Sequence, residues 1–361
     1  MKGEEDQPTQ NAQSEELNIS LDLKLVKKHK GWFNFRHSWS QLALKNENSY
    51  FIGPLDKEKF TLFENGEILF SGKVDNSGWT FMTGLTYIES LDCYLFNNNR
   101  SIYRKDIDQK PPYLFLDQNY MIGQDYLDQH QSLVFWNLKD RILSVVNLET
   151  KKTEFESKIS MGGQICGFRS FGGEGSKEYF VSLMQDGYLF LHELDFEKKE
   201  GAVVGFFNLE LDRQKNESTS CFAVCEKNQY VLLEAGVFKD GPAELKHSEY
   251  SRMVLVKLEG TNFVKKASTV VRSQKIGVKF ALKCCGYSGS HILWLALTST
   301  LYNQNGVIQI FDYNTVTGEL KELEQKRIPH QEKSPHHIHR FGDHYYYTGT
   351  NAKLMKLSLK Y

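Results

Sequence analysis

Histidines are the residues most able to do chemistry in this chain, and they gather near its C-terminus. The group consists of His330, His336, His337, His339 and His344. Imidazoles can hold a zinc ion, but a site needs about three or four ligands converging at about 2.0–2.1 Å. In an extended strand, His337 and His339 share one face while His336 points away. No nearby carboxylates complete a hydrolase site, so we expect no metal there; a pH-sensitive polar rim and ordinary surface or channel-lining side chains remain alternatives.

Cysteines and glycines could also support catalysis or ligand binding. The six cysteines lie in or beside apolar, strand-like segments: Cys93, Cys166, Cys221, Cys225, Cys284 and Cys285. The spacing of Cys221 and Cys225 does not fit a zinc knuckle, and adjacent cysteines in a strand point to opposite faces, so buried thiols are expected. The Gly-Gly-Glu-Gly run at 172–175 lacks the Gly-Lys-Ser/Thr ending of a phosphate-binding loop. These residues predict no catalytic group, no cofactor and no metal.

The charge balance also narrows the range of partners. Lys and Arg number 44 against 45 Asp and Glu, for a net charge of −1. No net field is available to hold a polyanion, so neither nucleic acid nor an anionic membrane is an expected partner. Residues 1–16 are polar and acidic and lack the apolar core of a secretory signal. A cytoplasmic, non-secreted protein is expected, with nuclear and cytoskeletal or ciliary locations as alternatives.

Any site must be positioned by short apolar strands that recur along the chain. Four of these segments begin at Phe60, Ser101, Arg141 and Tyr188, which gives steps of 41, 40 and 47 residues. A period of about 40–45 residues with four strands is typical of a propeller blade. The apolar runs are short, β-branched and aromatic, and no long stretch keeps a helical stripe. The pattern predicts an all-β fold, a seven-bladed β-propeller of four-stranded antiparallel blades.

The two ends of the chain complete this count. After residue 334 only three strands remain, while an orphan strand precedes the first complete blade. We expect this N-terminal strand to close the last blade, because closure removes open sheet edges. The predicted organisation is a tail at 1–16 and one domain at 17–361, divided into a closing strand at 17–28, blades at 31–74, 79–116, 120–160, 163–210, 219–271 and 277–328, and the rest of the seventh blade at 334–361.

Two segments carry a family resemblance. Residues 142–152 and 307–318 resemble the third strand and following turn of WD40-like seven-bladed propellers. The chain departs from that family because it has no Trp-Asp dipeptide ending a third strand and no Gly-His in a first strand. The resemblance implies a binding face made by loops that join second to third strands and by loops that link successive blades.

Two loops that join a second to a third strand, at 236–250 and 298–306, make their repeats longer than the period. The interblade connection at 329–336 is expected to open on the same side of the ring. Surface loops on a rigid scaffold commonly carry recognition. The predicted protein-binding residues are Phe238, Lys239, Leu245, His247, Tyr250, Leu301, Tyr302, Asn303, His330 and His336. Neutral drift is the alternative, because long loops cost little stability.

These observations favour a non-catalytic scaffold that binds other proteins within a larger assembly. The alternative is a propeller enzyme, a hydrolase or lactonase, which needs carboxylates, Asn or His converging from several blades on the central channel. A third interpretation is recognition of a modified peptide or RNA in the channel. The sequence names neither the partner nor the state of self-association.

Overall fold

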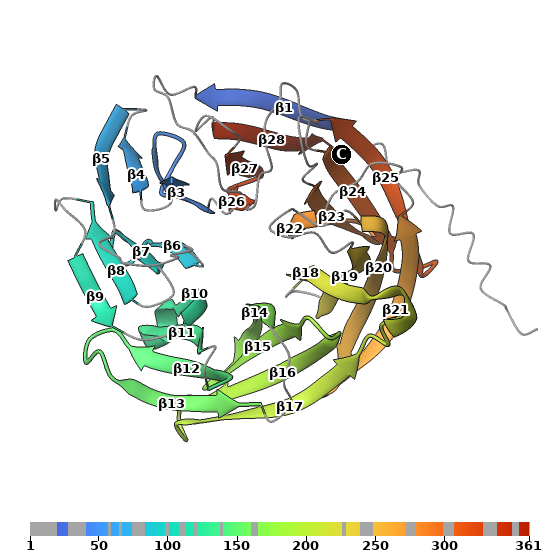
Figure 1. Ribbon diagram of the computed structural model, residues 1–361, viewed down its shortest axis with the longest axis horizontal. Helices are drawn as coiled ribbons and strands as arrows, with labels where there is room; N and C mark the ends of the chain where they lie inside the picture. The colour runs from blue at the N-terminus through green and yellow to red at the C-terminus, as the bar shows by residue number, and fades with distance from the viewer. Residues whose placement is uncertain are drawn as a thin grey trace, which may run out of the picture.

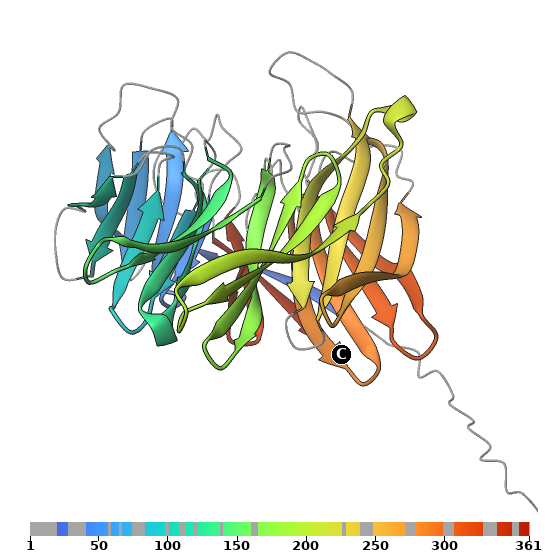
Figure 2. The same cartoon turned by 90° about the horizontal axis from the view of Figure 1, so that it is seen from below.

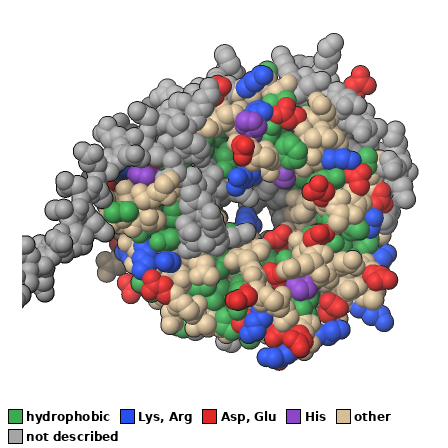
Figure 3. Space-filling view, turned by 180° about the vertical axis from the view of Figure 1, so that it is seen from behind, with side chains coloured by type: hydrophobic (Ala, Val, Ile, Leu, Met, Phe, Trp, Pro, Cys, Tyr) green, Lys and Arg blue, Asp and Glu red, His purple; other side chains and the backbone are tan. Residues whose placement is uncertain are grey.

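The computed structural model describes residues 20–27, 41–56, 59–64, 67–73, 84–97, 101–107, 113–117, 121–137, 140–159, 165–225, 229–238, 248–271, 279–298, 307–327, 338–348 and 354–360. These residues form β-sheets arranged in a ring (Figure 1). Seen from the opposite face, an opening lies at the centre of the ring, and cationic and anionic side chains are interspersed around it (Figure 3). The fold is therefore all-β and propeller-like, as the strand pattern predicted.

The strands of the first half of the chain form two four-stranded sheets and one eight-stranded sheet. The first sheet contains β2 (Gln41–Leu44), β3 (Ser49–Asp56), β4 (Lys59–Glu64) and β5 (Glu67–Lys73). The second contains β6 (Gly84–Ile88), β7 (Cys93–Asn97), β8 (Ser101–Asp106) and β9 (Tyr113–Asp117). The eight-stranded sheet joins β10 (Met121–Leu127), β11 (Ser132–Asn137), β12 (Ile142–Asn147) and β13 (Thr153–Lys158) to β17 (Glu200–Asn208), β16 (Tyr188–Asp195), β15 (Lys177–Met184) and β14 (Ile165–Glu174).

The second half of the chain adds three four-stranded sheets. One contains β18 (Glu217–Cys225), β19 (Tyr230–Phe238), β20 (Ser248–Glu259) and β21 (Asn262–Val271). The next contains β22 (Lys279–Ser288), β23 (His291–Thr298), β24 (Val307–Asn314) and β25 (Glu319–Arg327). The last contains β26 (His339–Phe341), β27 (His344–Thr348), β28 (Leu354–Lys360) and β1 (Ser20–Lys27). Two short 3-10 helices, η1 (Asp128–His130) and η2 (Arg213–Lys215), lie in connections.

The hydrophobic core lies between neighbouring sheets. One cluster joins Leu295 of β23 to Tyr345 of β27 and Leu357 of β28. Another joins Val145 of β12 to Phe180 of β15, so the two halves of the eight-stranded sheet also pack against each other. Middle strands are buried on both faces and read as continuous apolar runs, whereas outer strands such as β13 alternate between buried and exposed residues. Packing of sheet on sheet therefore holds the ring together.

The N-terminal strand lies where the sequence analysis placed it. Strand β1 pairs antiparallel with β28, from Ser20 opposite Lys360 to Lys27 opposite Leu354. The two segments are far apart in sequence and lie side by side in the ring (Figure 1). Strand β1 thus covers the outer edge of β28, and β1 is the rim strand of the last sheet.

One junction differs from the separate antiparallel blades that were expected. The outer strands β13 and β17 form a parallel bridge at a single residue pair, Ser157 and Gly201. A Cβ atom on Gly201 would lie 2.7 Å from the Ser157 Cβ and 2.9 Å from the Glu156 carbonyl oxygen. Glycine therefore permits the close approach that merges eight strands into one sheet.

Gly201→Ala is expected to destabilise the protein by about 1–3 kcal/mol, because the added methyl group forces the two outer strands apart. The free energy of unfolding, measured in urea, tests this expectation. Ala202→Val is the matched control, since Ala202 is exposed and follows directly in the same strand. Equal stability of Gly201→Ala and the wild type would show that the close approach is not required.

The described strands of two predicted blades begin at residues other than the predicted starts. Strand β18 begins at Glu217, before the predicted start of a blade at 219, because Glu217 already pairs with Val237. Residues 31–40 of the first predicted blade lie outside the described residues, and β2 begins at Gln41. Within the part of the chain that the structure describes, no helix is long and apolar enough to span a bilayer.

Candidate functional site

The predicted binding loops fall almost wholly outside the described residues. Lys239, Leu245, His247, Leu301, Tyr302, Asn303, His330 and His336 are not described. The backbones of Phe238 and Tyr250 belong to β19 and β20, where Phe238 pairs with Ser248. Strands β19 and β23 hold equivalent positions in neighbouring sheets. A protein-binding site at the loops that follow β19 and β23 therefore stays a prediction.

The histidine group is only partly described. His339 of β26 pairs with Tyr346, whereas His344 of β27 pairs with Phe341 and Ser358. The Nδ1 atom of His344 lies 3.0 Å from the Ser358 hydroxyl. Within the described ranges, no three His, Cys, Asp or Glu side chains lie close enough to hold a metal ion.

Described thiols and inner-strand charges offer little for catalysis. Burial raises the pKa of the Cys93 and Cys166 thiols to about 11, so both stay protonated at neutral pH. On the inner strands, Asp125 of β10 and Arg169 of β14 interact electrostatically. Among the described residues, this one electrostatic interaction does not make the convergent set of groups that a channel enzyme needs.

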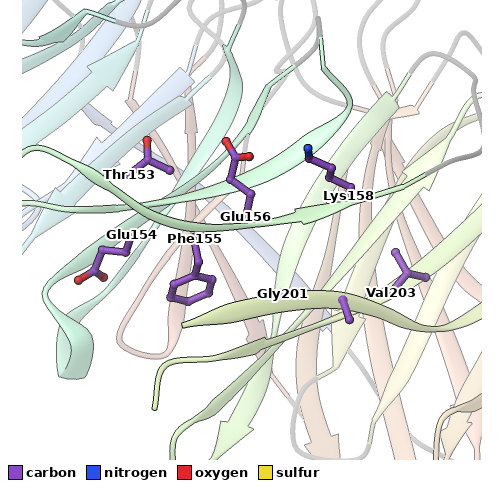
Figure 4. A pocket seen from close by; sticks show the side chains of 8 residues that line it. Thr153, Glu154, Phe155, Glu156, Lys158, Gly201 and Val203 are labelled. Atoms are coloured by element: carbon purple, nitrogen blue, oxygen red, sulfur yellow. The ribbon is translucent and has the colours of Figure 1, made fainter. Parts of the chain in front are cut away.

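A groove opens where β13 and β17 diverge from their bridge (Figure 4). Its volume is about 720 Å³, and it is lined by Thr153, Glu154, Phe155, Glu156, Lys158, Gly201, Ala202 and Val203. The Phe155 ring and the Glu154 carboxylate point toward β17, while Glu156 and Lys158 point to the other side of β13 (Figure 4). The lining therefore combines apolar residues of both strands with charged residues of β13.

The polar groups around this groove are largely satisfied within the protein. The Glu154 carboxylate accepts a hydrogen bond from the Ser132 hydroxyl at 3.3 Å and lies 3.9 Å from the Lys199 ammonium. The Phe155 ring packs edge-on against Phe196 with 5.1 Å between ring centroids. These contacts hold the Glu154 carboxylate and the Phe155 ring in place beside the bridge.

A buried histidine lies directly beneath the bridge. His192 of β16 is 3.0 Å from the Ser157 hydroxyl through Nδ1 and 2.9 Å from the Ser182 hydroxyl through Nε2. Burial lowers the pKa of His192 from 6.5 to about 3. A neutral imidazole donates through one nitrogen and accepts through the other, so it satisfies both serines. His192 therefore links β13, β15 and β16 and does not act as an exposed base.

A second pocket of about 680 Å³ lies where the first sheet meets the last. The Glu47 Oε1 atom accepts hydrogen bonds from the Lys356 ammonium at 2.6 Å and from the Tyr346 hydroxyl. These two contacts lower the pKa of Glu47, so its carboxylate is ionised at neutral pH. We call Glu47, Tyr346 and Lys356 the closure cluster, because they tie the β2–β3 turn to β27 and β28.

A histidine–aspartate pair is buried within one sheet. The Nδ1 atom of His291 lies 2.8 Å and 3.0 Å from the two Asp312 carboxylate oxygens, which joins β23 to β24. Burial raises the pKa of Asp312, and its hydrogen bond to His291 opposes that shift. The pair resembles a catalytic dyad in composition, but it lies between two buried strands and stabilises their pairing.

Comparison with solved structures shows what this geometry is similar to. The Nup133 β-propeller domain of Vanderwaltozyma polyspora has a TM-score of 0.58 and 11% identity, covering 96% of this chain and 99% of that chain. BBS1N, solved in complex with ARL6DN, also has a TM-score of 0.58 and 11% identity, with 94% and 95% covered. The dihydro-heme d1 dehydrogenase NirN has a TM-score of 0.52 and 12% identity, with 80% and 57% covered. At these identities the similarity shows the propeller fold alone.

No protein-family model matches the sequence. No curated protein sequence matches it significantly either. The fold is therefore the feature that relates this chain to known proteins.

Proposed function

We propose that the protein is a non-catalytic, WD40-like propeller that serves as a protein-binding scaffold in a multiprotein assembly. The observation that carries this proposal is the similarity of nearly the whole ring to Nup133 and BBS1N, the second of which was solved with a protein partner. The polar clusters of the described residues also support it, because they join strands and sheets. We propose a location in the cytoplasm, nucleus or cilium.

We also propose that the ring counts seven blades. The eight-stranded sheet then represents two blades, because its halves share one bridge and pack together through Val145 and Phe180 as neighbouring sheets do. The proposed blades follow the predicted ranges, with β1 as the outer strand of the seventh. The partner site is proposed at the loops that follow β19 and β23, together with the connection at 329–336.

An enzymatic propeller is the second candidate. NirN is a dehydrogenase with a similar fold, and hydrazine synthase has a TM-score of 0.52 over 76% of this chain. The charged residues described on the inner strands, Asp125 and Arg169, support an enzyme less well than a scaffold.

Exchanging residues 239–247 and 299–306 for short Gly-containing turns is expected to abolish capture of the partner and leave the melting temperature unchanged. The wild type and the exchange variant are immobilised separately and incubated with native extract. The proteins that each one captures are quantified by mass spectrometry. Exchange of the β24–β25 turn, at 315–318, is the control. Retained capture by the first variant would refute the loop site.

A further inference from the structure

Arg169 is both open to solvent and enclosed by protein. It belongs to β14, which is one of the innermost strands of the ring, together with β10 and β18 (Figure 1). The residue is exposed, yet burial lowers the pKa of its guanidinium. A side chain that solvent reaches but protein surrounds lies in an interior space. Arg169 therefore lies in the central channel.

Groups from both neighbouring inner strands act on the Arg169 guanidinium. Asp125 of β10 and Cys221 of β18 interact with it electrostatically. The guanidinium carbon lies 5.8 Å from the centre of the Phe222 ring, which is buried in β18. A Cβ atom on Gly167 would lie 3.9 Å from the Arg169 Nη1 atom and 3.7 Å from this ring. The guanidinium is thus held beside β18 and still faces Asp125.

The local structure of β14 fixes this side chain. The register of β14 against β15 shifts between Ile165 and Gly167 and again between Ser170 and Gly173, so bulges lie on both sides of Arg169. Bulges change the direction of nearby side chains and are common beside functional sites. The Nη1 atom donates a hydrogen bond to the Phe168 carbonyl oxygen at 2.7 Å. Arg169 is therefore positioned before any ligand binds, which lowers the entropic cost of binding.

Most donors of this guanidinium are free to bind a ligand. A guanidinium has five N–H donors, and among the described residues its bond to Phe168 is the only hydrogen bond that Arg169 makes. No carboxylate of the described residues lies within ion-pair distance of it. Hydrogen bonds between charged groups are stronger than neutral ones. An anion that reaches the channel would therefore find a cation with unused donors.

Two other charged residues of the inner strands are engaged differently. The Glu217 carboxylate of β18 lies 2.8 Å from the Arg252 guanidinium. Arg340 of β26 is exposed, but it lies two residues before Gly342 and donates through Nε to the Gly342 carbonyl oxygen at 3.2 Å. Arg340 thus lies beside the β26–β27 turn, whereas Arg169 lies within its strand between two bulges.

We propose that the central channel contains a carboxylate-binding site, in which the Arg169 guanidinium binds both oxygens of one carboxylate group. The planar guanidinium fork matches a carboxylate, and the Phe222 ring lies over one face of the fork, so the ligand meets its edge. Asp125 opposes a doubly charged phosphate more strongly than a singly charged carboxylate. A free carboxylic acid or an acidic side chain of a peptide supplies this group. The site is separate from the loops that follow β19 and β23 and does not depend on them.

NMR spectroscopy of the full chain, labelled with ¹³C,¹⁵N-arginine, tests the proposal. The probe is propionate, and propionamide is its uncharged isostere. Propionate is expected to shift the Nε–Hε resonance of Arg169, whereas propionamide is not. The relaxation of propionate itself gives its dissociation constant, which Arg169→Gln is expected to raise at least about tenfold. Arg340→Gln is the matched control and is expected to leave this constant unchanged.

Two capped pentapeptides that differ only in a central Glu or Gln identify the source of the carboxylate. Binding of the Glu peptide at least as tight as that of propionate, and weaker binding of the Gln peptide, would indicate an acidic peptide. Tighter binding of propionate would indicate a small acid.

The wild-type comparison of propionate with propionamide keeps the proposal testable if Arg169→Gln folds poorly. An Arg169 resonance that moves with no carboxylate, or moves equally with propionamide, would overturn the proposal. Tighter binding of inorganic phosphate than of propionate would overturn it as well, as would equal propionate binding by folded Arg169→Gln and Arg340→Gln.

Discussion

Removing residues 1–30 is expected to abolish cooperative melting or cause aggregation, whereas removing residues 1–14 is expected to leave the melting temperature unchanged. The longer deletion removes β1 and uncovers the edge of β28 from Leu354 to Lys360. Each lost strand hydrogen bond costs about 0.5–1.5 kcal/mol, so the total is a large part of a typical stability of about 5–15 kcal/mol. Val26 also packs against the cluster between the first and last sheets.

A strand variant that keeps the tail separates loss of the strand from loss of the tail. Lys24 and Leu25 lie opposite Lys356 and Met355 in β1, and both are exposed. Alternate residues of an antiparallel strand bond to the partner strand, so proline at both positions removes at least one hydrogen bond to β28. The double proline variant should therefore lower the melting temperature more than the double alanine variant does. Equal melting temperatures for the two truncations would contradict closure of the ring by β1.

Acidification is expected to weaken the fold through His192. Its folded pKa of about 3 lies below the ordinary histidine value of 6.5, so below pH 6.5 the unfolded chain binds a proton that the folded chain does not. The free energy of unfolding then falls by about 1.4 kcal/mol per pH unit as pH decreases from 6.5 toward 3. Above pH 6.5 the contribution of His192 is constant.

Urea unfolding of the wild type and His192→Gln, at several pH values between 7.5 and 4, measures this effect. The variant is expected to be less stable at pH 7.5, because Ser157 and Ser182 lose their shared partner, but its stability should fall less steeply with acid. The difference between the two curves removes the contribution of carboxylates common to both proteins. Parallel curves would contradict a neutral, buried His192.

Much of the fold could be predicted because blade strands leave local signals. The recurring segments that begin at Ser101 and Tyr188 coincide with the starts of β8 and β16. The Asp-Gly turn before Tyr188 lies between β15 and β16, where Gly187 adopts a φ of +94° that suits glycine. The pairing of β1 with β28 also followed from counting strands. The parallel bridge at Gly201 could not be predicted, because the twist and spacing of two blades decide it, and a single glycine is its only signal in the sequence.

Sites proved harder to predict than strands. The closure cluster joins Glu47 to Tyr346 and Lys356 across nearly the whole chain, and none of the three stands out in its own segment. His192 looks like one polar residue in an apolar strand, and only packing shows the two serines beside it. Arg169 is the one cation of β14, and only the arrangement of the inner strands shows which groups it faces.

Cross-linking mass spectrometry of the protein in native extract tests the central claim, that this propeller is a protein-binding scaffold, most directly. The predicted result is reproducible cross-links to one or a few other proteins, concentrated at 239–247, 299–306 and 329–336 and lost in the loop-exchange variant. Cross-links spread evenly over the ring, or none to another protein, would contradict the claim.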